Sequence, residues 1–418
     1  GLLDFFVGGP SGCAVLPIAH SAGFDIPIHF GIIKEVLRQY GYKLDFYEGT
    51  TEQMLKEGLK SVHNDLCYPA IIVIGQLMAA LKSGEFDPDK TELMITQTGG
   101  GCRASNYIHL LRKALKKGGY EQVPVISVNA SGLERHPGFK LTPALLGKCL
   151  IAMWYGDLIM WVSNQCKPYE LNKGDTQKVS DHWVSYLADI SSTPKFLQIK
   201  RQYKAILRDF EAIPKHHVEK IKVGIVGEIY VKYSPLGNNH LEDFLIREGA
   251  EVVMAGVGDF MMYCLSNREI DARLYGRCGI GVLTCKLGYH YLHHAQRKMI
   301  KCIKRFSHFK APTDFEKVKK LASDFMGLGV KMGEGWLLTA EMLELVESGV
   351  QNVICTQPFG CLPNHIVGKG MMRKIKEIYP ESNIVAIDYD PSSAKVNQEN
   401  RIKLMLANGM QNIHLKNA

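Results

Sequence analysis

One motif occurs twice in this chain: NVICTQPFGCLPNHIVGKGMMRKIKE, from Asn352 to Glu377, and ELMITQTGGGCRASNYIHLLRKALKK, from Glu92 to Lys117. Each copy begins with an apolar strand pattern, continues through Thr-Gln and a glycine-bearing turn to Gly-Cys, and ends in a helical pattern with basic residues. Another strand pattern follows each copy, at 383–390 and at 123–130. We interpret the two stretches as copies of one structural unit.

The likeness extends upstream of both copies. In each half a strand pattern runs into glycine, an amphipathic helix pattern with a C-terminal glycine leads to a second strand, and another helix leads to the Thr-Gln strand. These segments are 4–12, 32–49 and 64–84 in the first half and 221–230, 241–258 and 333–349 in the second. Each half therefore reads βαβαβαβ, an alternation that calls for a mostly parallel sheet covered by helices.

We predict an α/β fold of two pseudo-repeated Rossmann- or flavodoxin-like parallel-sheet domains with helical insertions. The first α/β domain is expected to span residues 1–150, and a helical linker or cover to span 151–217. The second α/β domain is expected to span 218–418, with a helical insertion at about 267–330.

Composition excludes several classes of protein. With 418 residues, 46% hydrophobic and 22% charged, the chain is ordinary for a soluble globular protein. Its net charge of +8 is scattered, and it has neither a P-loop nor a nucleic-acid-binding motif. We find no run of apolar residues long enough to span a membrane and no charged leader. We expect a cytoplasmic protein that binds no nucleic acid and no membrane. The missing initiator methionine indicates a trimmed start, a tag remnant or a piece of a longer chain.

Six of the eleven cysteines follow strands or begin helices, where open α/β sheets bind their ligands. The six are Cys13, Cys67, Cys102, Cys264, Cys355 and Cys361. No pair has C-x-x-C spacing, which disfavours zinc ribbons and thioredoxin-like motifs, and a disulfide framework belongs to small secreted domains. The thiols are therefore either small core hydrophobes or metal ligands. We assign the remaining five, in the helical segments, to the core.

The ligand interpretation is favoured for Cys67, Cys102 and Cys361. Each is expected at a helix N-terminus, which lowers the pKa of a thiol and favours the thiolate that a metal needs. Three thiolates suffice for an iron–sulfur cubane with one iron left open, whereas a structural zinc site takes four ligands.

Three polar side chains adjoin these cysteines. His63, Arg103 and His365 are either solvent-facing residues at helix ends or groups that deliver protons and tune the cluster potential.

Four segments resemble the 2-hydroxyacyl-CoA dehydratase superfamily: HNDLCYP (63–69), GGGCRA (99–104), GIVGEIYVKYSPLGNNHLEDFL (224–245) and QPFGCLPNHIV (357–367). Within it the chain is most similar to activase-associated dehydratase-like proteins and double-cubane cluster proteins. The resemblance implies Rossmann- or flavodoxin-like domains and a cubane held by Cys67, Cys102 and Cys361. Double-cubane members need six cysteines, a number that Cys13, Cys264 and Cys355 would complete.

The resemblance also implies a function. We expect a low-potential iron–sulfur reductase or dehydratase-like lyase of anaerobic metabolism, acting on a small molecule or acyl-CoA at a 4Fe–4S or double-cubane 8Fe–9S cluster. Its electrons would come from an ATP-dependent iron–sulfur activase, separate or fused, and it could form a homodimer. Two alternatives stay open: an electron-transfer component without substrate chemistry of its own, and a metal-free acyl-CoA-binding or regulatory module.

Overall fold

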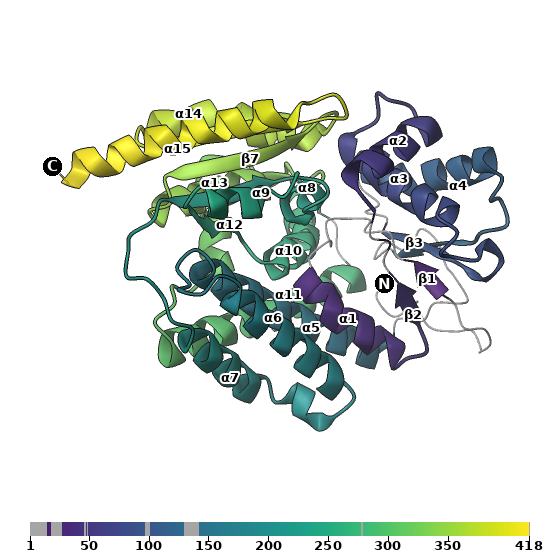
Figure 1. The fold of residues 1–418 in the computed structure, drawn as a ribbon, viewed down its shortest axis with the longest axis horizontal. Coiled ribbons are helices and arrows are strands. Elements are labelled where there is room, and N and C mark those ends of the chain that lie inside the picture. Colours follow the sequence, from purple (N-terminus) through teal and green to yellow (C-terminus); the bar gives the residue numbers. More distant parts are fainter. Residues whose placement is uncertain are drawn as a thin grey trace.

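The computed structural model describes residues 15–17, 27–45, 47, 49–96, 101–128, 142–276 and 279–417. The fold is mostly helical with small parallel sheets, which confirms the α/β class (Figure 1). The strand expected at 4–12 and the thiol of Cys13 lie outside the described residues.

The second half contains a four-stranded parallel sheet in the order β6-β5-β7-β8. Its strands are β5 (Lys222–Gly227), β6 (Glu251–Val253), β7 (Asn352–Pro358) and β8 (Asn383–Tyr389). Every residue of β7 is buried, as expected for an inner strand of a parallel sheet covered on both faces.

Helices surround this sheet, and α15 runs along β7 and β8 in Figure 1. The helices of this half outside the insertion are α8 (Ile229–Tyr233), α9 (Leu241–Arg247), α13 (Trp336–Glu347), α14 (Met372–Ile378) and α15 (Lys395–Asn417). A π-helical turn, η4 (Asn364–Gly368), and a 3₁₀ turn, η5 (Lys369–Met371), connect β7 to α14.

The first half contains two parallel strand pairs, β1 with β2 and β3 with β4. These strands are β1 (Val15–Pro17), β2 (Lys43–Asp45), β3 (Leu93–Thr96) and β4 (Val125–Val128). The helices are α1 (Pro27–Arg38), α2 (Thr51–Ser61), α3 (Tyr68–Lys82) and α4 (Tyr107–Gly118), with 3₁₀ turns η1 (Pro88–Lys90) and η2 (Arg103–Asn106).

Helix α3 is the buried centre of the first half. Its residues from Tyr68 to Leu81 are all buried, which is the behaviour of a helix that is apolar all round. A methyl group on Gly75 would lie 1.9 Å from the carbonyl oxygen of Met54, so the backbones of α2 and α3 approach as closely as glycine allows. Close packing on this scale fixes the position of the α3 N-terminus.

Two helical segments cover the sheets. The first holds α5 (Pro143–Cys166), α6 (Asp175–Ile190), the 3₁₀ turn η3 (Pro194–Leu197) and α7 (Ile199–Glu211), and the second holds α10 (Val257–Tyr275), α11 (Ile280–Phe306) and α12 (Phe315–Phe325). The sequence placed the second insertion from about 267, but its first helix begins ten residues earlier.

The early start of α10 has a tertiary cause. The Asp157 carboxylate, on α5, accepts hydrogen bonds from the backbone N–H groups of Val257 and Gly258, at 2.8 and 2.9 Å. It also pairs with His29 Nε2 of α1 at 2.8 Å. Asp157 thus caps α10 from another helix, which no local sequence signal reports.

Among the described helices, one has the length and the apolar composition needed to cross a membrane, and that helix is α5. Because 61% of its most apolar window is buried inside the protein, core packing accounts for that composition.

Candidate functional site

Cys67 lies at the N-cap of α3, at the edge of the first half that faces the second. Its Sγ lies 2.9 Å from Tyr107 Oη, and the Ala70 backbone N–H donates to the Cys67 carbonyl at 2.9 Å. Burial raises the pKa of the Cys67 thiol, and the Tyr107 hydroxyl and the Ala70 N–H oppose the rise.

Cys102 occupies the N-cap of η2, at the beginning of the α4 segment. Its thiol accepts from the Ala104 backbone N–H, yet burial and the charge of Glu334 raise its pKa to about 12. The preceding residue, Gly101, donates its N–H to Met332 Sδ at 3.1 Å, which ties this turn to the second half.

Cys361 follows β7 and is buried. Its Sγ lies 3.3 Å from the side-chain amide of Asn364. With the amide oriented to satisfy both ends, its oxygen accepts from the Glu228 backbone N–H and its nitrogen donates to the Thr356 oxygen. Burial, followed by the charges of Glu334 and Glu228, raises the pKa of the Cys361 thiol well above its ordinary value.

Contacts between the halves bring these three thiols together. The Tyr68 N–H donates to the Phe359 carbonyl at 2.9 Å, which joins the start of α3 to the turn before Cys361. Gly360 in that turn has φ +69°, and a methyl group there would lie 3.1 Å from the Cys67 Cα.

Cys102 meets the same turn through a second glycine. A methyl group on Gly333 would lie 2.9 Å from Pro363 Cγ and 3.9 Å from Cys102 Sγ. Pro363 is two residues beyond Cys361, so all three thiols lie around one junction of the two halves.

Two carboxyl groups face the same junction. Glu228 caps α8, where it accepts from the Val231 N–H at 2.9 Å, and Glu334 accepts from the Ile229 N–H at 3.0 Å. Burial and the neighbouring Glu334 raise the pKa of Glu228 to about 8, and burial raises the pKa of Glu334. Without a metal this site therefore holds protons on its thiols and on Glu228 at neutral pH, and a bound cation would displace the protons of the thiols.

Cys355, another predicted ligand, lies apart from this trio. Cys355 is fully buried in β7, where its Sγ would lie 3.2 Å from a methyl group on Gly368. It packs in the smaller core cluster with Met342 and Ile375, not in the one that contains Cys67.

Cys264 lies on α10 with its side chain exposed. Protein atoms still surround the thiol closely enough that burial raises its pKa to about 12, with Glu334 contributing. Shared proximity to Glu334 places Cys264 on the side of the junction where Cys102 lies. Whether Cys264 and Cys355 bind a cluster stays a prediction.

The polar candidates are all exposed. His63 contacts its neighbour Asp65, and His365 lies on η4 with its side chain toward solvent. Arg103 donates to the Asp65 carbonyl at 2.9 Å and is near enough to lower the pKa of Cys67 slightly.

Sequence reasoning missed four polar residues at the junction: Tyr107, Glu228, Glu334 and Asn364. Glu228 and Asn364 stood within the motifs, directly after a strand and three residues beyond a cysteine, so their positions were a usable signal. Tyr107 and Glu334 meet the thiols only through tertiary contacts, and no spacing along the chain indicates them.

The other described cysteines match the core interpretation. Cys166 and Cys302 are buried in α5 and α11, and Cys149 and Cys285 are half-buried on the same two helices. Cys278 lies outside the described residues.

No three His, Cys, Asp or Glu side chains in the described part of the chain are grouped around a position for one metal ion. A cubane places each thiolate on a different iron, so it needs its sulfurs spread more widely than a single ion does. Three sulfurs around one buried junction, each with a nearby N–H donor, fit that requirement by donor type and burial.

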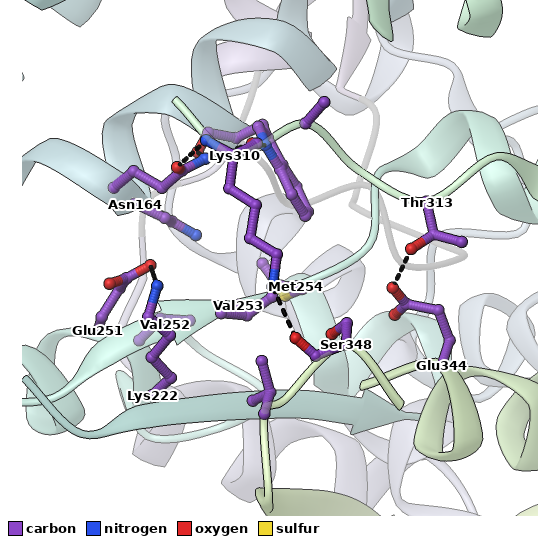
Figure 2. Close-up of a pocket in the computed structure, with 14 residues that line it drawn as sticks. Asn164, Lys222, Glu251, Val252, Val253, Met254, Lys310, Thr313, Glu344 and Ser348 are labelled. Atoms are coloured by element: carbon purple, nitrogen blue, oxygen red, sulfur yellow. Dashed lines mark hydrogen bonds and ion pairs between the residues drawn. The ribbon is translucent and has the colours of Figure 1, made fainter. Parts of the chain in front are cut away.

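The pocket in Figure 2 is separate from the thiols. It lies between α5, the start of β6 and the segment around Lys310, and Thr313 Oγ1 contacts the Glu344 carboxylate at its edge. Its volume of about 30 Å³ leaves room for a water molecule but not for a substrate.

Comparison with known proteins adds no assignment: no family model matches the chain, and no curated protein matches it. The site must therefore be interpreted from its own geometry.

Proposed function

We propose that this chain binds an iron–sulfur cubane through Cys67, Cys102 and Cys361 and works as a low-potential reductase or dehydratase-like enzyme. The observation that carries the proposal is the convergence of three thiols from two halves at one buried junction. Free cysteines in a core have no reason to gather in this way at the N-terminal ends of three turns.

The finer architecture belongs to the same proposal. We infer two pseudo-repeated Rossmann- or flavodoxin-like domains, because β1–β2 and β3–β4 are parallel pairs as β5–β6 and β7–β8 are. Cys102 and Cys361 then follow equivalent third strands, β3 and β7, and a pseudo-twofold relation between the halves would bring them face to face.

A cubane would supply one-electron chemistry at low potential and an open iron for a substrate oxygen. The chain's own groups set the conditions around it. The Tyr107 hydroxyl would hydrogen-bond the Cys67 sulfur, and the backbone N–H groups of Ala104 and Asn364 would do the same for Cys102 and Cys361, contacts that tune cluster potential.

Access and proton supply follow from the same geometry. Cys67 and Cys361 are buried while Cys102 is half-buried, so a substrate would approach on the Cys102 side. Glu228, whose pKa is about 8, holds a proton beside that position, where a hydroxyl leaving group would need one. An ATP-dependent iron–sulfur activase would be the electron source, and an acyl-CoA or small molecule the substrate.

The described geometry favours a single 4Fe–4S cluster over the 8Fe–9S double cubane. A second cubane would need the thiols of Cys264 and Cys355 close together. These two residues occupy separate positions: Cys264 is exposed on α10, and Cys355 packs against Gly368.

The test is iron and acid-labile sulfide analysis of protein prepared without oxygen. We expect about four irons per chain for one cubane. Cys361→Ser should lose most of the iron, whereas Cys166→Ser, a buried cysteine on α5, should keep it. A colourless wild-type protein, or equal iron in both variants, would refute the cluster, and about eight irons would restore the double cubane.

The same preparation separates an enzyme from an electron carrier. Reduction by an activase with ATP, followed by consumption of a 2-hydroxyacyl-CoA, would support the enzyme. Reduction without any turnover, with electrons passed to a second protein, would support the electron-transfer alternative.

A further inference from the structure

A groove lies between α6 and α7, on the outside of the helical cover. Aromatic residues of α6 and a mainly basic face of α7 line it, and its volume is about 500 Å³. That size is typical of sites that bind one small molecule. In Figure 1, α7 lies on the side of the molecule away from α3 and α4, and no cysteine lines the groove, so it is separate from the thiols.

One wall of the groove is aromatic. It consists of the rings of His182, Trp183 and Tyr186, all on α6. The Tyr186 ring stacks on His182 with ring centroids 6.3 Å apart, and it meets Trp183 edge-on at 5.3 Å. His182 is exposed and Tyr186 is half-buried, so ring surface stays open to a ligand. This wall suits a planar aromatic group that can stack.

The same wall contains an unused hydrogen-bond donor. Trp183 is only 5% exposed, and its indole N–H has no acceptor among the described residues. A buried donor without an acceptor destabilises a folded protein. An oxygen atom of a ligand that reached this N–H would supply the missing acceptor.

The opposite wall is cationic. Arg201, Lys204 and Arg208 follow one another at intervals of three and four residues, so their side chains share one face of α7. Asp209 also lines the groove, and its Oδ1 accepts from Nε and Nη2 of Arg208 at 3.1 and 3.0 Å. Three cations and one carboxylate give the lining a net charge of +2 when His182 is neutral.

Two of the three cations have no carboxylate partner. Arg201 donates to the side-chain oxygen of Gln198 at 3.3 Å, and Lys204 Nζ lies 5.4 Å from the centroid of the Phe306 ring. Neither cation forms an ion pair with a residue that the structure describes. Their positive charge is therefore available to an anionic ligand.

The surroundings add to this positive charge. Residues 190–208 contain five lysines and arginines and no Asp or Glu. Helix α11, which packs against α7, contains six lysines and arginines and again no Asp or Glu. Asp181, Asp189 and Glu211 are the nearest further carboxylates along α6 and α7, and none of them lines the groove. A positive field of this kind attracts anions to the groove.

We propose that this groove binds a nucleoside phosphate, with its base against the rings of His182 and Tyr186 and its phosphates against Arg201 and Lys204. Aromatic side chains stack on a base whatever its identity, and Arg and Lys are the side chains that pair with phosphate. One groove contains both walls, so a single molecule can contact both at once. Free nucleotides and coenzyme A share this chemistry. The proposal does not depend on whether the thiols bind a cluster.

The test is isothermal titration calorimetry of ADP into the metal-free full chain. We expect saturable binding of ADP and weaker binding of adenosine and of inorganic pyrophosphate, because each of these reaches only one wall. Arg201→Gln should weaken ADP binding by about tenfold or more, the effect of losing one hydrogen bond between charged groups. Tyr186→Leu should weaken the binding of ADP and adenosine and leave that of pyrophosphate unchanged.

Arg373→Gln provides the matched control. Arg373 is 91% exposed on α14 and does not line the groove, so this variant should bind ADP as the wild type does. Circular dichroism should show that all three variants are folded. Titration with coenzyme A distinguishes the two sources of the ligand. Binding at least as tight as that of ADP, with the same loss in Arg201→Gln, assigns the groove to coenzyme A, and weaker binding assigns it to a free nucleotide.

Four results would overturn the proposal. The first is the absence of saturable ADP binding at millimolar concentration. The second is ADP binding that neither Arg201→Gln nor Tyr186→Leu changes, which would place the nucleotide elsewhere on the chain. The third is pyrophosphate binding as tight as that of ADP, which would mean that the groove recognises charge alone. The fourth is tighter binding of a single-stranded oligonucleotide, lost in the same two variants, which would assign the groove to nucleic acid.

Discussion

Substituting alanine for Gly360 tests the contact that joins the two halves at the thiols. Gly360 has φ +69°, a region that residues with a Cβ adopt at a penalty. Its added methyl group would lie 3.1 Å from the Cα and 3.3 Å from the backbone nitrogen of Cys67. Both are main-chain atoms at the start of the buried helix α3, so no rotamer change can relieve the crowding.

The magnitude follows from two separable effects. The left-handed backbone conformation costs a residue other than glycine about 1–2 kcal/mol. Crowding in a well-packed position costs about 1–3 kcal/mol more. We expect Gly360→Ala to lower the free energy of unfolding by roughly 2–5 kcal/mol.

Gly349→Ala isolates the second effect. Gly349 has φ +90° but no heavy atom within 4 Å of the added methyl, so only the backbone penalty of about 1–2 kcal/mol applies. Urea unfolding of both variants in metal-free form should show the larger loss for Gly360→Ala. Anaerobic preparations should show reduced iron for that variant alone, because its methyl moves Cys361 away from Cys67. Equal losses of stability together with full iron in both variants would refute a tight junction.

Three further predictions concern buried charges. In metal-free protein Glu228, whose pKa in the folded state is about 8 against 4.5 when unfolded, binds its proton more tightly when folded. The proton on Glu228 stabilises the folded state fully below pH 4.5, and this stabilisation, up to about 5 kcal/mol, is lost as the pH rises through 8. The urea midpoints measured at pH 5.5 and at pH 8 should therefore differ less in Glu228→Gln than in the wild type. Both oxygens of the Glu341 carboxylate lie 2.9 Å from Lys232 Nζ, so Lys232→Met leaves a buried carboxylate without its cationic partner. The free energy of unfolding should fall by about 3–5 kcal/mol. A loss below about 1 kcal/mol would mean that water solvates the carboxylate instead. Asp157→Ala leaves His29 and two backbone N–H groups without their acceptor, which should lower the thermal midpoint well beyond the effect of a surface Asp→Ala such as Asp181→Ala.

The fold class was predictable because local patterns agree with the tertiary structure. Glycines expected to end the helices of the two upstream units, Gly41 and Gly249, do have left-handed φ values of +88° and +85°. Cys67 and Cys102 are N-cap residues, as the alternation of strand, glycine turn and helix indicated. These features depend on neighbours within a few residues, which a sequence displays directly.

Other parts of the site depend on which face of an element a residue occupies. Every position of β7 is buried, so its sequence shows no alternation of apolar and polar residues. Without that alternation, the sequence does not show that Cys355 faces the core near Gly368 and not the ligand-binding end of the strand. Glu228 and Glu334 are 106 positions apart in the chain. They lie together because the Glu334 carboxylate accepts a hydrogen bond from the backbone N–H of Ile229, the residue after Glu228. Such pairs form only once the halves are docked.

Asp157 gives the fold a property that domain boundaries drawn along the chain do not suggest. Its carboxylate, on α5, binds His29 of α1 and the first N–H groups of α10. If α5 separated from α1 or from α10, these buried donors would lose their acceptor. Local opening is therefore suppressed here, and the whole chain is expected to unfold in one cooperative transition. In native-state hydrogen exchange, the amides of Val257 and Gly258 should be among the slowest in the protein, exchanging only through global unfolding. The helical segments, although inserted between the α/β units along the chain, would then contribute to the stability of both halves.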